Sequence, residues 1–497
     1  MGSSKGIAGA CSRREFLGSA ASAAAITVLP RRVLGGKGNV APGDKITAAC
    51  IGVGAQGTRV MMDLLKEADV QIVAVCDVNR ESSDYVEWAP GELRDKERQL
   101  VASAEWGQDW KGPTAGREPA RRLVEAYYAG KTTSGVYKGC ATYVDYRELL
   151  EQQRDLDAVI VGTPDHAHAM ISIAAMKKRK HVLCQKPLTH SIAEARRIAE
   201  VARETRVATQ VTIGNQASEA TRLLCEWIWA GAIGAVREVH NWSTRPFWPQ
   251  GIERPASAEA VPAGLEWDLW LGPAPFRPFN RAYLPFVWRG WYDFGCGAIG
   301  DMGCYSFDTI FRALKLGPPA SVEASSTRAF KETYPAASIM HFQFPARGEM
   351  PPVRLTWYDG GLRPSRPAEL EDGREMGREN EGLLFIGDRG SILCGFNGSD
   401  PRLIPESKMQ EFKQPPKTLP RSAGNYREWI ECCKGGKPGG ANFEFEGPVT
   451  EALLLGNVAL RAGKKLYWDG PSMKVVSPAE AQQYVTSEYR PGVSPLL

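Results

Sequence analysis

A glycine pattern between an apolar strand and a helix constrains this chain more than any other feature. Residues 45–51 have the pattern of a buried strand, and Gly52-Val53-Gly54-Ala55-Gln56-Gly57 follows at once. Apolar residues then recur at helical spacing, and residues 71–76 form a second predicted strand that ends on Asp77. The order of strand, G-x-G-x-x-G, helix, strand and acid is typical of a dinucleotide-binding fold.

Each position of the glycine pattern has a physical role in that fold. Gly52 permits a tight turn, Gly54 lets the backbone approach a pyrophosphate, and Gly57 lets the helix pack closely on the strand. The helix that begins near Ala55 and Gln56 attracts the phosphate charge at its N-terminus. We therefore expect all five residues to contact a dinucleotide.

Asp77 lies twenty residues beyond Gly57, where a carboxylate accepts hydrogen bonds from the adenosine ribose. The same carboxylate would repel a 2′-phosphate, which favours NAD over NADP. Arg80 lies close by in the sequence and leaves NADP as the less favoured alternative.

Composition excludes several other classes of protein. The chain has 497 residues, 43% of them hydrophobic and 24% charged, which is enough for two or three packed cores. Its net charge of +4 is spread along the chain, so no basic stripe points to nucleic acid. The 11 cysteines include no C-x-x-C pair, and only six histidines are present. These counts argue against a disulfide framework and a metal site.

The N-terminal 44 residues are predicted to be an export signal and linker. Ser12-Arg13-Arg14-Glu15-Phe16-Leu17 precedes an Ala-rich apolar run over residues 18–29 and resembles a twin-arginine signal. The run is too short to span a bilayer, which needs roughly 20 residues. We expect recognition by the twin-arginine export machinery, no stable membrane span and a periplasmic or secreted protein. The sequence leaves the cleavage site open.

Further apolar strands follow a polar segment, about 81–117, that is interpreted as a surface insertion. Strands are predicted at 141–143, 156–162 and 181–184. The second of these ends on Thr163-Pro164, and His168 follows; the third ends on Gln185-Lys186-Pro187. In a parallel sheet, ligands bind at the carboxyl ends of the strands, so these residues should converge with the glycine pattern.

The second half of the chain has a different pattern, which begins near residue 234. Extended segments replace the alternation of strand and helix at 236–244, 321–330, 339–344, 353–358 and 383–395, and helices are predicted at 425–433 and 449–461. Eight of the 14 tryptophans fall between residues 227 and 291. Such a cluster suits either a saccharide pocket or ordinary interface packing.

In this order, these residues resemble the glucose-fructose oxidoreductase, inositol dehydrogenase and rhizopine-catabolism (Gfo/Idh/MocA) family. The resemblance covers residues 45 to about 470. The family's usual Glu-Lys-Pro motif is Gln185-Lys186-Pro187 here, which keeps the lysine and loses the carboxylate. Segments around Asn215, Trp291 and Asp301 look like those of a secreted bacterial subgroup.

The resemblance implies an α/β protein with two domains. An N-terminal Rossmann domain over 45–213 would bind NAD(P). A C-terminal α+β domain over 214–470 would carry an open, mostly antiparallel sheet, followed by a tail at 471–497. A sugar or polyol would bind between the domains. The open sheet face also favours a homo-oligomer.

The resemblance also implies the chemistry. Lys186 would lie beside the nicotinamide and take the hydroxyl proton, with a pKa lowered by desolvation. Many members carry Asp-x-x-x-His in the second domain, but here the spacing gives Asp301 and Tyr305, with Asp308 beyond. A tyrosine, with a reference pKa of about 10, is a poorer base than histidine at neutral pH. The substitution shifts the proton transfer to Lys186.

Three sets of site residues follow. We expect catalysis from Lys186, Asp301 and Tyr305. The expected cofactor contacts are Gly52, Gly54, Ala55, Gln56, Gly57, Asp77, Thr163, Pro164, His168, Gln185, Lys186 and Asn215. The expected substrate contacts are Trp291, Asp301, Tyr305 and Asp308. No metal ligand is expected.

Three functions remain open at this point. The first is an oxidoreductase for a sugar or polyol hydroxyl, with tightly bound nicotinamide because free NAD is scarce outside the cytoplasm. The second is an NAD-dependent glycosidase that oxidises the sugar C3 hydroxyl transiently and eliminates the substituent. The third is a carbohydrate-binding protein without turnover.

Overall fold

Six apolar segments form a parallel sheet in the first half of the chain. In this computed structural model, which describes residues 42–493, the strand order is β3-β2-β1-β4-β5-β6. The strands are β1 (Ile46–Ile51), β2 (Val70–Cys76), β3 (Ala141–Tyr143), β4 (Ala158–Val161), β5 (His181–Cys184) and β6 (Thr209–Val211). β1 pairs with β2 on one side and with β4 on the other. The order in which successive strands are added to the sheet therefore reverses at β1, although all the strands are parallel. Ligands bind beyond the carboxyl ends of the strands at such a point.

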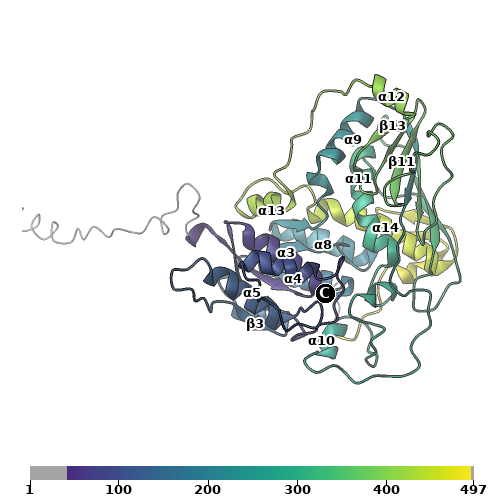
Figure 1. Ribbon diagram of the computed structural model, residues 1–497. Coiled ribbons are helices and arrows are strands. Elements are labelled where there is room, and N and C mark those ends of the chain that lie inside the picture. The colour runs from purple at the N-terminus through teal and green to yellow at the C-terminus, as the bar shows by residue number, and fades with distance from the viewer. Residues whose placement is uncertain (1–41, 494–497) are drawn as a thin grey trace, which may run out of the picture. The chain divides into compact units, whose positions relative to one another are not determined.

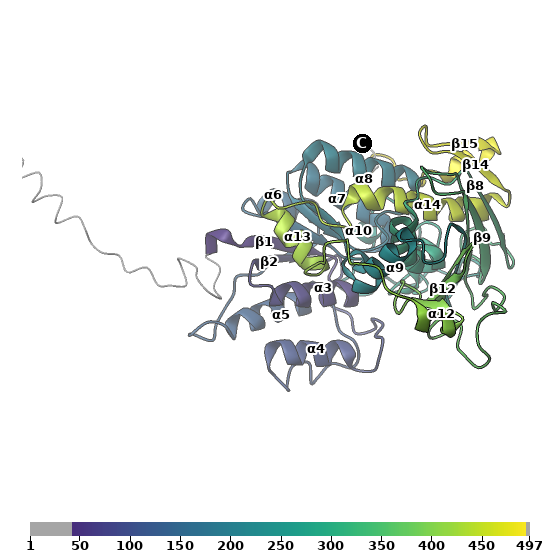
Figure 2. The same ribbon diagram turned by 90° about the horizontal axis from the view of Figure 1, so that it is seen from above.

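Helices cover both faces of this sheet (Figure 2). One face carries α3 (Ala55–Lys66), α4 (Glu92–Val101) and α5 (Arg117–Ala129), and the other carries α6 (Tyr146–Gln152), α7 (Asp165–Lys177) and α8 (Ile192–Thr205). Each layer buries its own core, with Met61 and Leu64 in one and Ile171 and Ile198 in the other. The arrangement confirms the predicted Rossmann domain.

The second sheet has nine strands in the order β13-β12-β11-β7-β10-β9-β8-β14-β15. The strands are β7 (Val236–Trp242), β8 (Ser321–Ser326), β9 (Ser338–Phe344), β10 (Val353–Tyr358), β11 (Gly382–Gly387), β12 (Ser391–Cys394), β13 (Arg402–Ile404), β14 (Leu466–Asp469) and β15 (Lys474–Ser477). Neighbours in this described sheet are antiparallel except β7 and β10, which confirms the predicted, mostly antiparallel sheet. The single strand expected at 383–395 is a hairpin, because Asp388, Arg389 and Gly390 turn the chain back between β11 and β12.

Three helices cover one face of the nine-stranded sheet, namely α9 (Glu219–Trp229), α11 (Cys304–Leu314) and α14 (Phe443–Ala462) (Figure 1). Alternate residues of β9 point into this core, with Met340, Phe342 and Phe344 buried and Gln343 exposed. The remaining short helices are η1 (Pro42–Asp44), η2 (Asn215–Ala217), α10 (Trp267–Leu271), η3 (Val287–Gly290), η4 (Ile299–Gly303), α12 (Glu406–Glu411) and η5 (Ala479–Tyr484).

The C-terminal part of the chain returns to the first domain. α13 (Asn425–Cys433) inserts Trp429 and Ile430 into the core beneath α3, and α14 packs along α8. Within the segment expected to be a tail, residues 474–477 form β15 at the edge of the second sheet. The last described residues of this segment reach the cavity described below.

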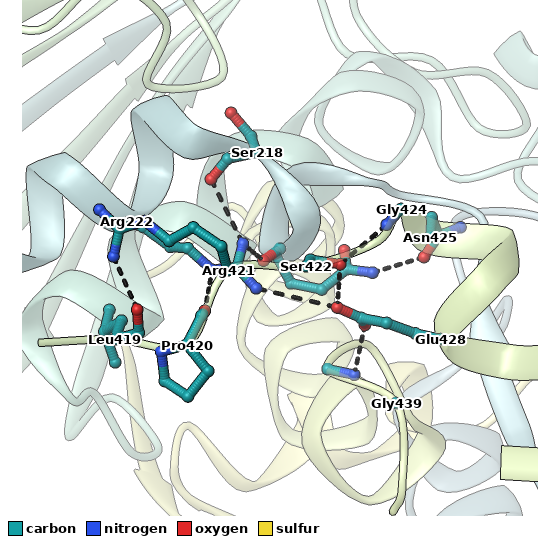
Figure 3. Close-up of polar contacts among 12 residues, drawn as sticks. Ser218, Arg222, Leu419, Pro420, Arg421, Ser422, Gly424, Asn425, Glu428 and Gly439 are labelled. Atoms are coloured by element: carbon teal, nitrogen blue, oxygen red, sulfur yellow. Dashed lines mark hydrogen bonds and ion pairs between the residues drawn. The ribbon is translucent and has the colours of Figure 1, made fainter. Parts of the chain in front are cut away.

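A group of hydrogen bonds and ion pairs fixes the segment that leads into α13 (Figure 3). Arg222 on α9 donates to the carbonyl oxygen of Pro420 over 2.7 Å, and its guanidinium lies 3.8 Å from Glu428. Arg421 pairs with Glu226 at 2.7 Å, and Ser422 hydrogen-bonds Glu428. These contacts join α9 of the second domain to the helix that packs on the first.

The predicted export signal, with Arg13 and Arg14, lies outside the described residues. Between residues 42 and 493, no helix is both long enough and apolar enough to cross a membrane.

Candidate active site

A cavity of about 1510 Å³ lies at the carboxyl edge of the parallel sheet and extends to the second domain. Its walls include the glycine loop after β1, Asp77 after β2, Thr163 after β4 and Lys186 after β5. The second domain contributes residues of the loops before α11 and of η4. The strand ends predicted to converge therefore do so.

The glycine loop is shaped by two close backbone approaches. Gly52 has a φ of +81°, and a Cβ there would lie 2.5 Å from the backbone nitrogen of Thr163. A Cβ on Gly57 would overlap the carbonyl oxygen of Gly52, so the glycine lets α3 pack against the end of β1. α3 begins at Ala55, and its N-cap, Gly54, offers no side-chain hydrogen bond. Gly54, Ala55 and Gln56 line the cavity, so the first N–H groups of α3 are available to an anion there.

The segment expected to be a surface insertion also forms one wall of the cavity. Six of the residues 81–88 line the cavity, and the ring of Tyr85 occupies the space beside Gly54, 2.9 Å from where a Cβ would stand. α4 follows within the same segment. The only sequence signal for this role was the presence of Tyr85 and Trp88 in an otherwise polar stretch.

Two features fit a dinucleotide at this end of the cavity. The Asp77 carboxylate accepts hydrogen bonds from the backbone N–H groups of Val53 (2.7 Å) and Asn79 (2.8 Å), which hold it beside the glycine loop. A carboxylate has about four lone-pair positions, so acceptor capacity remains for ribose hydroxyls. The hydroxyl oxygen of Thr163 is buried without a hydrogen-bond partner, and a ligand in the cavity could supply one. Burial raises the pKa of Asp77 to about 6.

The reactive end of the cavity is built around Lys186 and Asp301. Lys186 Nζ donates to the Asp301 carboxylate over 2.9 Å and to the Asp301 carbonyl oxygen over 2.6 Å. Arg289 Nε donates to the same carboxylate oxygen over 3.0 Å. The side chains of all three are mostly buried, and all three line the cavity. Two cations therefore share one carboxylate.

A π-helical turn presents Asp301 in this way. η4 spans Ile299–Gly303 and runs directly into α11. Wide turns of this kind are rare and occur most often at functional sites. Its glycines are required by packing, since a Cβ on Gly300 would overlap Cys296 and one on Gly303 would lie 2.9 Å from Ile299.

The charge state of Lys186 differs from the expectation. Burial acts to lower its pKa, but the Asp301 carboxylate, with smaller contributions from Tyr305 and Cys304, raises it above the ordinary value. Conversely, burial acts to raise the pKa of Asp301, and Lys186 and Arg289 lower it below the usual range. Lys186 is thus an ammonium at neutral pH and not the neutral base expected from desolvation.

Tyr305 lies where the resemblance places it, on the cavity wall beside the lysine. Its ring centroid is 5.1 Å from Lys186 Nζ, and burial raises its pKa. At neutral pH its hydroxyl is therefore protonated, and it can donate a hydrogen bond but not accept a proton as a phenolate.

The sequence interpretation missed Asp165, the first residue of α7. Its carboxylate lines the cavity, is 3% exposed and accepts a hydrogen bond from the backbone N–H of Cys296 over 3.1 Å. Burial raises the pKa of Asp165 to about 7, against the opposing effect of Arg289 and Lys186. It is the cavity carboxylate whose pKa best matches proton transfer at neutral pH. Its position directly after Thr163-Pro164 was the available signal.

Five residues expected in the site do not line the cavity, and one of them, Gly57, packs against Gly52 instead. His168 is buried between two loops, where its ring nitrogens lie 2.8 Å from the carbonyl oxygens of Thr163 and Pro187. Burial lowers its pKa to about 4. Asn215 donates to the carbonyl oxygen of Tyr305 over 2.7 Å and so holds the start of α11. Both residues support the walls of the cavity.

The other two, Trp291 and Asp308, make structural contacts away from the cavity. Trp291 is fully buried in an aromatic core with Trp267 and Trp270, and Asp308 is paired with Arg312 at 2.6 Å. From the tryptophan cluster expected near the substrate, Trp270 and Trp288 line the cavity. Gln185 and Pro164 also line it as expected. Among the described residues, no group of three or more His, Cys, Asp or Glu side chains is arranged to hold a metal ion.

Two family models match the chain one after the other. Residues 117–213 match the NAD-binding Rossmann fold of the Gfo/Idh/MocA oxidoreductase family, and residues 230–334 match the C-terminal alpha/beta domain of that family. The two matches fall in different domains and together span less than half of the chain. The first match ends just after β6. The second contains Asp301, which pairs with Lys186 of the first match.

Two curated relatives match this chain over part of their length. A levoglucosan dehydrogenase from Pseudarthrobacter phenanthrenivorans is 29% identical over 110 residues, which is 21% of this chain and 28% of the relative. A glycosyl hydrolase family 109 protein from Stenotrophomonas maltophilia is 27% identical over 179 residues, 35% of this chain and 30% of the relative. The chain thus matches less than a third of either relative.

A solved structure supports the same fold over a longer span. The WlbA dehydrogenase from Bordetella pertussis, determined with NADH and UDP-GlcNAcA, covers 86% of this chain and 99% of its own with a TM-score of 0.53. The identity is 15%, so this likeness concerns the fold alone.

Proposed function

We propose that the chain is an NAD-dependent oxidoreductase acting on a sugar or polyol hydroxyl. The observation that carries the proposal is one cavity that contains both the glycine loop of a dinucleotide site and the Lys186–Asp301 pair, 2.9 Å apart. The family matches and the named dehydrogenase relative support it.

The residues of the glycine loop, Asp77 and Thr163 would hold the nucleotide. When bound, its nicotinamide supplies the hydride acceptor for the sugar carbon. Lys186 donates a hydrogen bond to the reacting oxygen, which stabilises negative charge on it, while Asp301 and Arg289 keep the ammonium in place. Asp165 accepts the hydroxyl proton, because Lys186 is already protonated.

Proton transfer to Asp165 predicts that the rate of sugar oxidation depends on pH. The ionised form of Asp165 is the active one for oxidation, and its pKa is about 7. The rate of sugar oxidation should therefore rise as the pH increases through 7 and level off above it. The Asp165→Asn variant should lose this rising limb of the pH profile and most of the rate. The measurement is the initial rate of nucleotide reduction from pH 5.5 to 9.

Asp268 provides the matched control, since its carboxylate also lines the cavity but is 73% exposed and pairs with Arg490. The Asp268→Asn variant should keep the limb near pH 7. An unchanged limb in the Asp165→Asn variant would show that another group accepts the proton.

NAD is the nucleotide that the charges favour. Asp77 places a carboxylate beside the glycine loop. The two first-domain arginines that line the cavity are already paired, Arg59 with Glu92 at 2.6 Å and Arg147 with Asp145 at 2.5 Å. The Asp77 carboxylate would repel a 2′-phosphate. We propose that the NAD is held tightly.

The direct assay of the proposed function mixes the purified protein and NAD with a panel of aldoses, ketoses and polyols. Nucleotide reduction by at least one member, followed at the absorbance of the reduced nicotinamide, is the expected result.

A second candidate is an NAD-dependent glycosidase that oxidises the C3 hydroxyl, eliminates the C2 proton and the glycosidic substituent at C1, adds water at C1 and then returns the hydride to C3. The similarity to the glycosyl hydrolase family 109 protein favours it. Release of p-nitrophenol from p-nitrophenyl glycosides with no net nucleotide reduction would select this candidate over net oxidation.

We also propose export by the twin-arginine route, which the motif at Arg13 and Arg14 supports. An exported enzyme needs a nucleotide that stays bound and is reoxidised in place. Homo-oligomerisation through the second sheet stays a prediction.

A further inference from the structure

Three aromatic side chains from distant parts of the sequence meet on the wall of the cavity, and we call them the aromatic platform. They are Trp88, Phe247 and Phe286. Trp88 is 56% exposed and Phe247 is 55% exposed, although both lie against other rings. Large apolar side chains that remain exposed together are unusual in a soluble domain and often mark a binding site.

The rings of the platform are held in a fixed arrangement. Phe247 and Phe286 are stacked, with centroids 5.9 Å apart and an interplanar angle of 9°. Trp88 stands edge-on to both, at 6.3 Å and 6.0 Å. Trp88 comes from the first domain and the two phenylalanines from the second, so the platform bridges the domains beside the cavity.

Phe286 adds two observations that tie the platform to the reactive end of the cavity. Its φ of +67° is in a region that favours glycine, and such strain is found most often at ligand clamps and active sites. Arg289, which binds Asp301 over 3.0 Å, also lies over the Phe286 ring at 4.3 Å. One side chain therefore separates the Lys186–Asp301 pair from the platform.

The charges beside Trp88 and Phe247 favour a neutral ligand, whereas Arg289, which shares Asp301 with Lys186, places positive charge on the Phe286 side toward the reactive end. Arg59 lies over the Trp88 ring at 5.7 Å and Arg245 over the Phe247 ring at 4.8 Å. Both are neutralised by carboxylates, Arg59 by Glu92 at 2.6 Å and Arg245 by Glu381 at 2.9 Å. A charged ligand would gain little there, whereas an uncharged ring with a flat C–H or π face matches the exposed aromatic surface.

We propose that the aromatic platform binds the second, neutral ring of a glycoside whose first sugar ring reacts at Lys186. This inference rests on the proposed function and narrows its substrate from a free sugar to a glycoside. A sugar and an aromatic aglycone present the same kind of face, so the test includes both.

The test compares p-nitrophenyl glycosides, disaccharides and methyl glycosides of the same hexoses on the NAD-loaded full chain. In the wild-type protein, the two-ring ligands should bind more tightly. The Phe247→Ala and Trp88→Ala variants should weaken the binding of the two-ring ligands roughly tenfold and leave the methyl glycosides within about twofold. Binding is measured by calorimetry, and KM and kcat for the same ligands are measured in parallel.

Phe276 is the matched control, because it is 69% exposed and does not line the cavity. The Phe276→Ala variant should bind every ligand like the wild type, and melting temperatures check that all the variants are folded. Equal losses for methyl and two-ring ligands, or no loss for either, would overturn the platform and leave the oxidoreductase proposal standing. Selective loss of two-ring binding in a protein without turnover would support the platform and overturn the oxidoreductase.

Discussion

Replacing Lys186 with alanine is expected to lower kcat for sugar-dependent NAD reduction by about 10³-fold, the upper end of the range for removing a donor that stabilises charge on a reacting oxygen. Lys186 is the ammonium that faces the reacting oxygen, and it is anchored to Asp301 at 2.9 Å. Nucleotide affinity should change little, because the glycine loop and Asp77 are not in contact with this side chain. The variant should stay folded, because Arg289 continues to pair with the buried Asp301 carboxylate at 3.0 Å.

The measurement is a steady-state rate for the variant and the wild type with the same sugar, alongside NAD binding by fluorescence. An exposed lysine on β15, Lys474, supplies the control, and its alanine variant should match the wild type. Retention of kcat within a few-fold in the Lys186→Ala variant would contradict the assigned role. Sugar binding without turnover in the wild type would instead point to the carbohydrate-binding alternative.

Replacing Gly57 with alanine should disable the nucleotide site. The added methyl group would overlap the Gly52 carbonyl oxygen, which belongs to the backbone and cannot rotate away. α3 and the loop must then move apart at a cost of about 2 kcal/mol, as in other overpacked sites. Relaxation moves the loop out of the shape that cradles the nucleotide, and restoring that shape on binding lowers NAD affinity roughly 30-fold. The melting temperature should also fall.

Gly317→Ala is the control for this change, because a Cβ there meets nothing within 4 Å and its φ is not positive. NAD affinity and the melting temperature of that variant should equal those of the wild type. Gly57→Ala protein that is folded and binds NAD with wild-type affinity would exclude the glycine loop as the nucleotide cradle.

Local patterns were enough to predict the first domain and its nucleotide end. The strand before Gly52 and the acid after β2 are short-range signals, and the structure brings both to the cavity. The resemblance placed both Lys186 and Asp301 in the site, but their pairing, between residues 115 positions apart, was not predicted. No spacing argument within one domain could have supplied it.

The predictions that were wrong or missing for the site residues can each be explained physically. Asp308 lies seven residues beyond Asp301, which in a regular helix returns to nearly the same face. The wide turn of η4 changes that phase, and Asp308 instead pairs with Arg312 beneath α14. The pKa of Lys186 was assigned the wrong direction because desolvation was considered without the carboxylate. Trp88 was missed because it lines the cavity from a loop, where no periodic pattern of apolar residues marks it in the sequence.

The central claim is that this cavity binds NAD for reaction with a sugar. Native mass spectrometry of the purified chain, as isolated and after addition of equimolar NAD and NADP, tests it most directly. The account predicts one nucleotide per chain, with NAD retained in preference to NADP, and a loss of that mass in the Gly57→Ala variant. A wild-type chain that carries neither nucleotide under both conditions would contradict it.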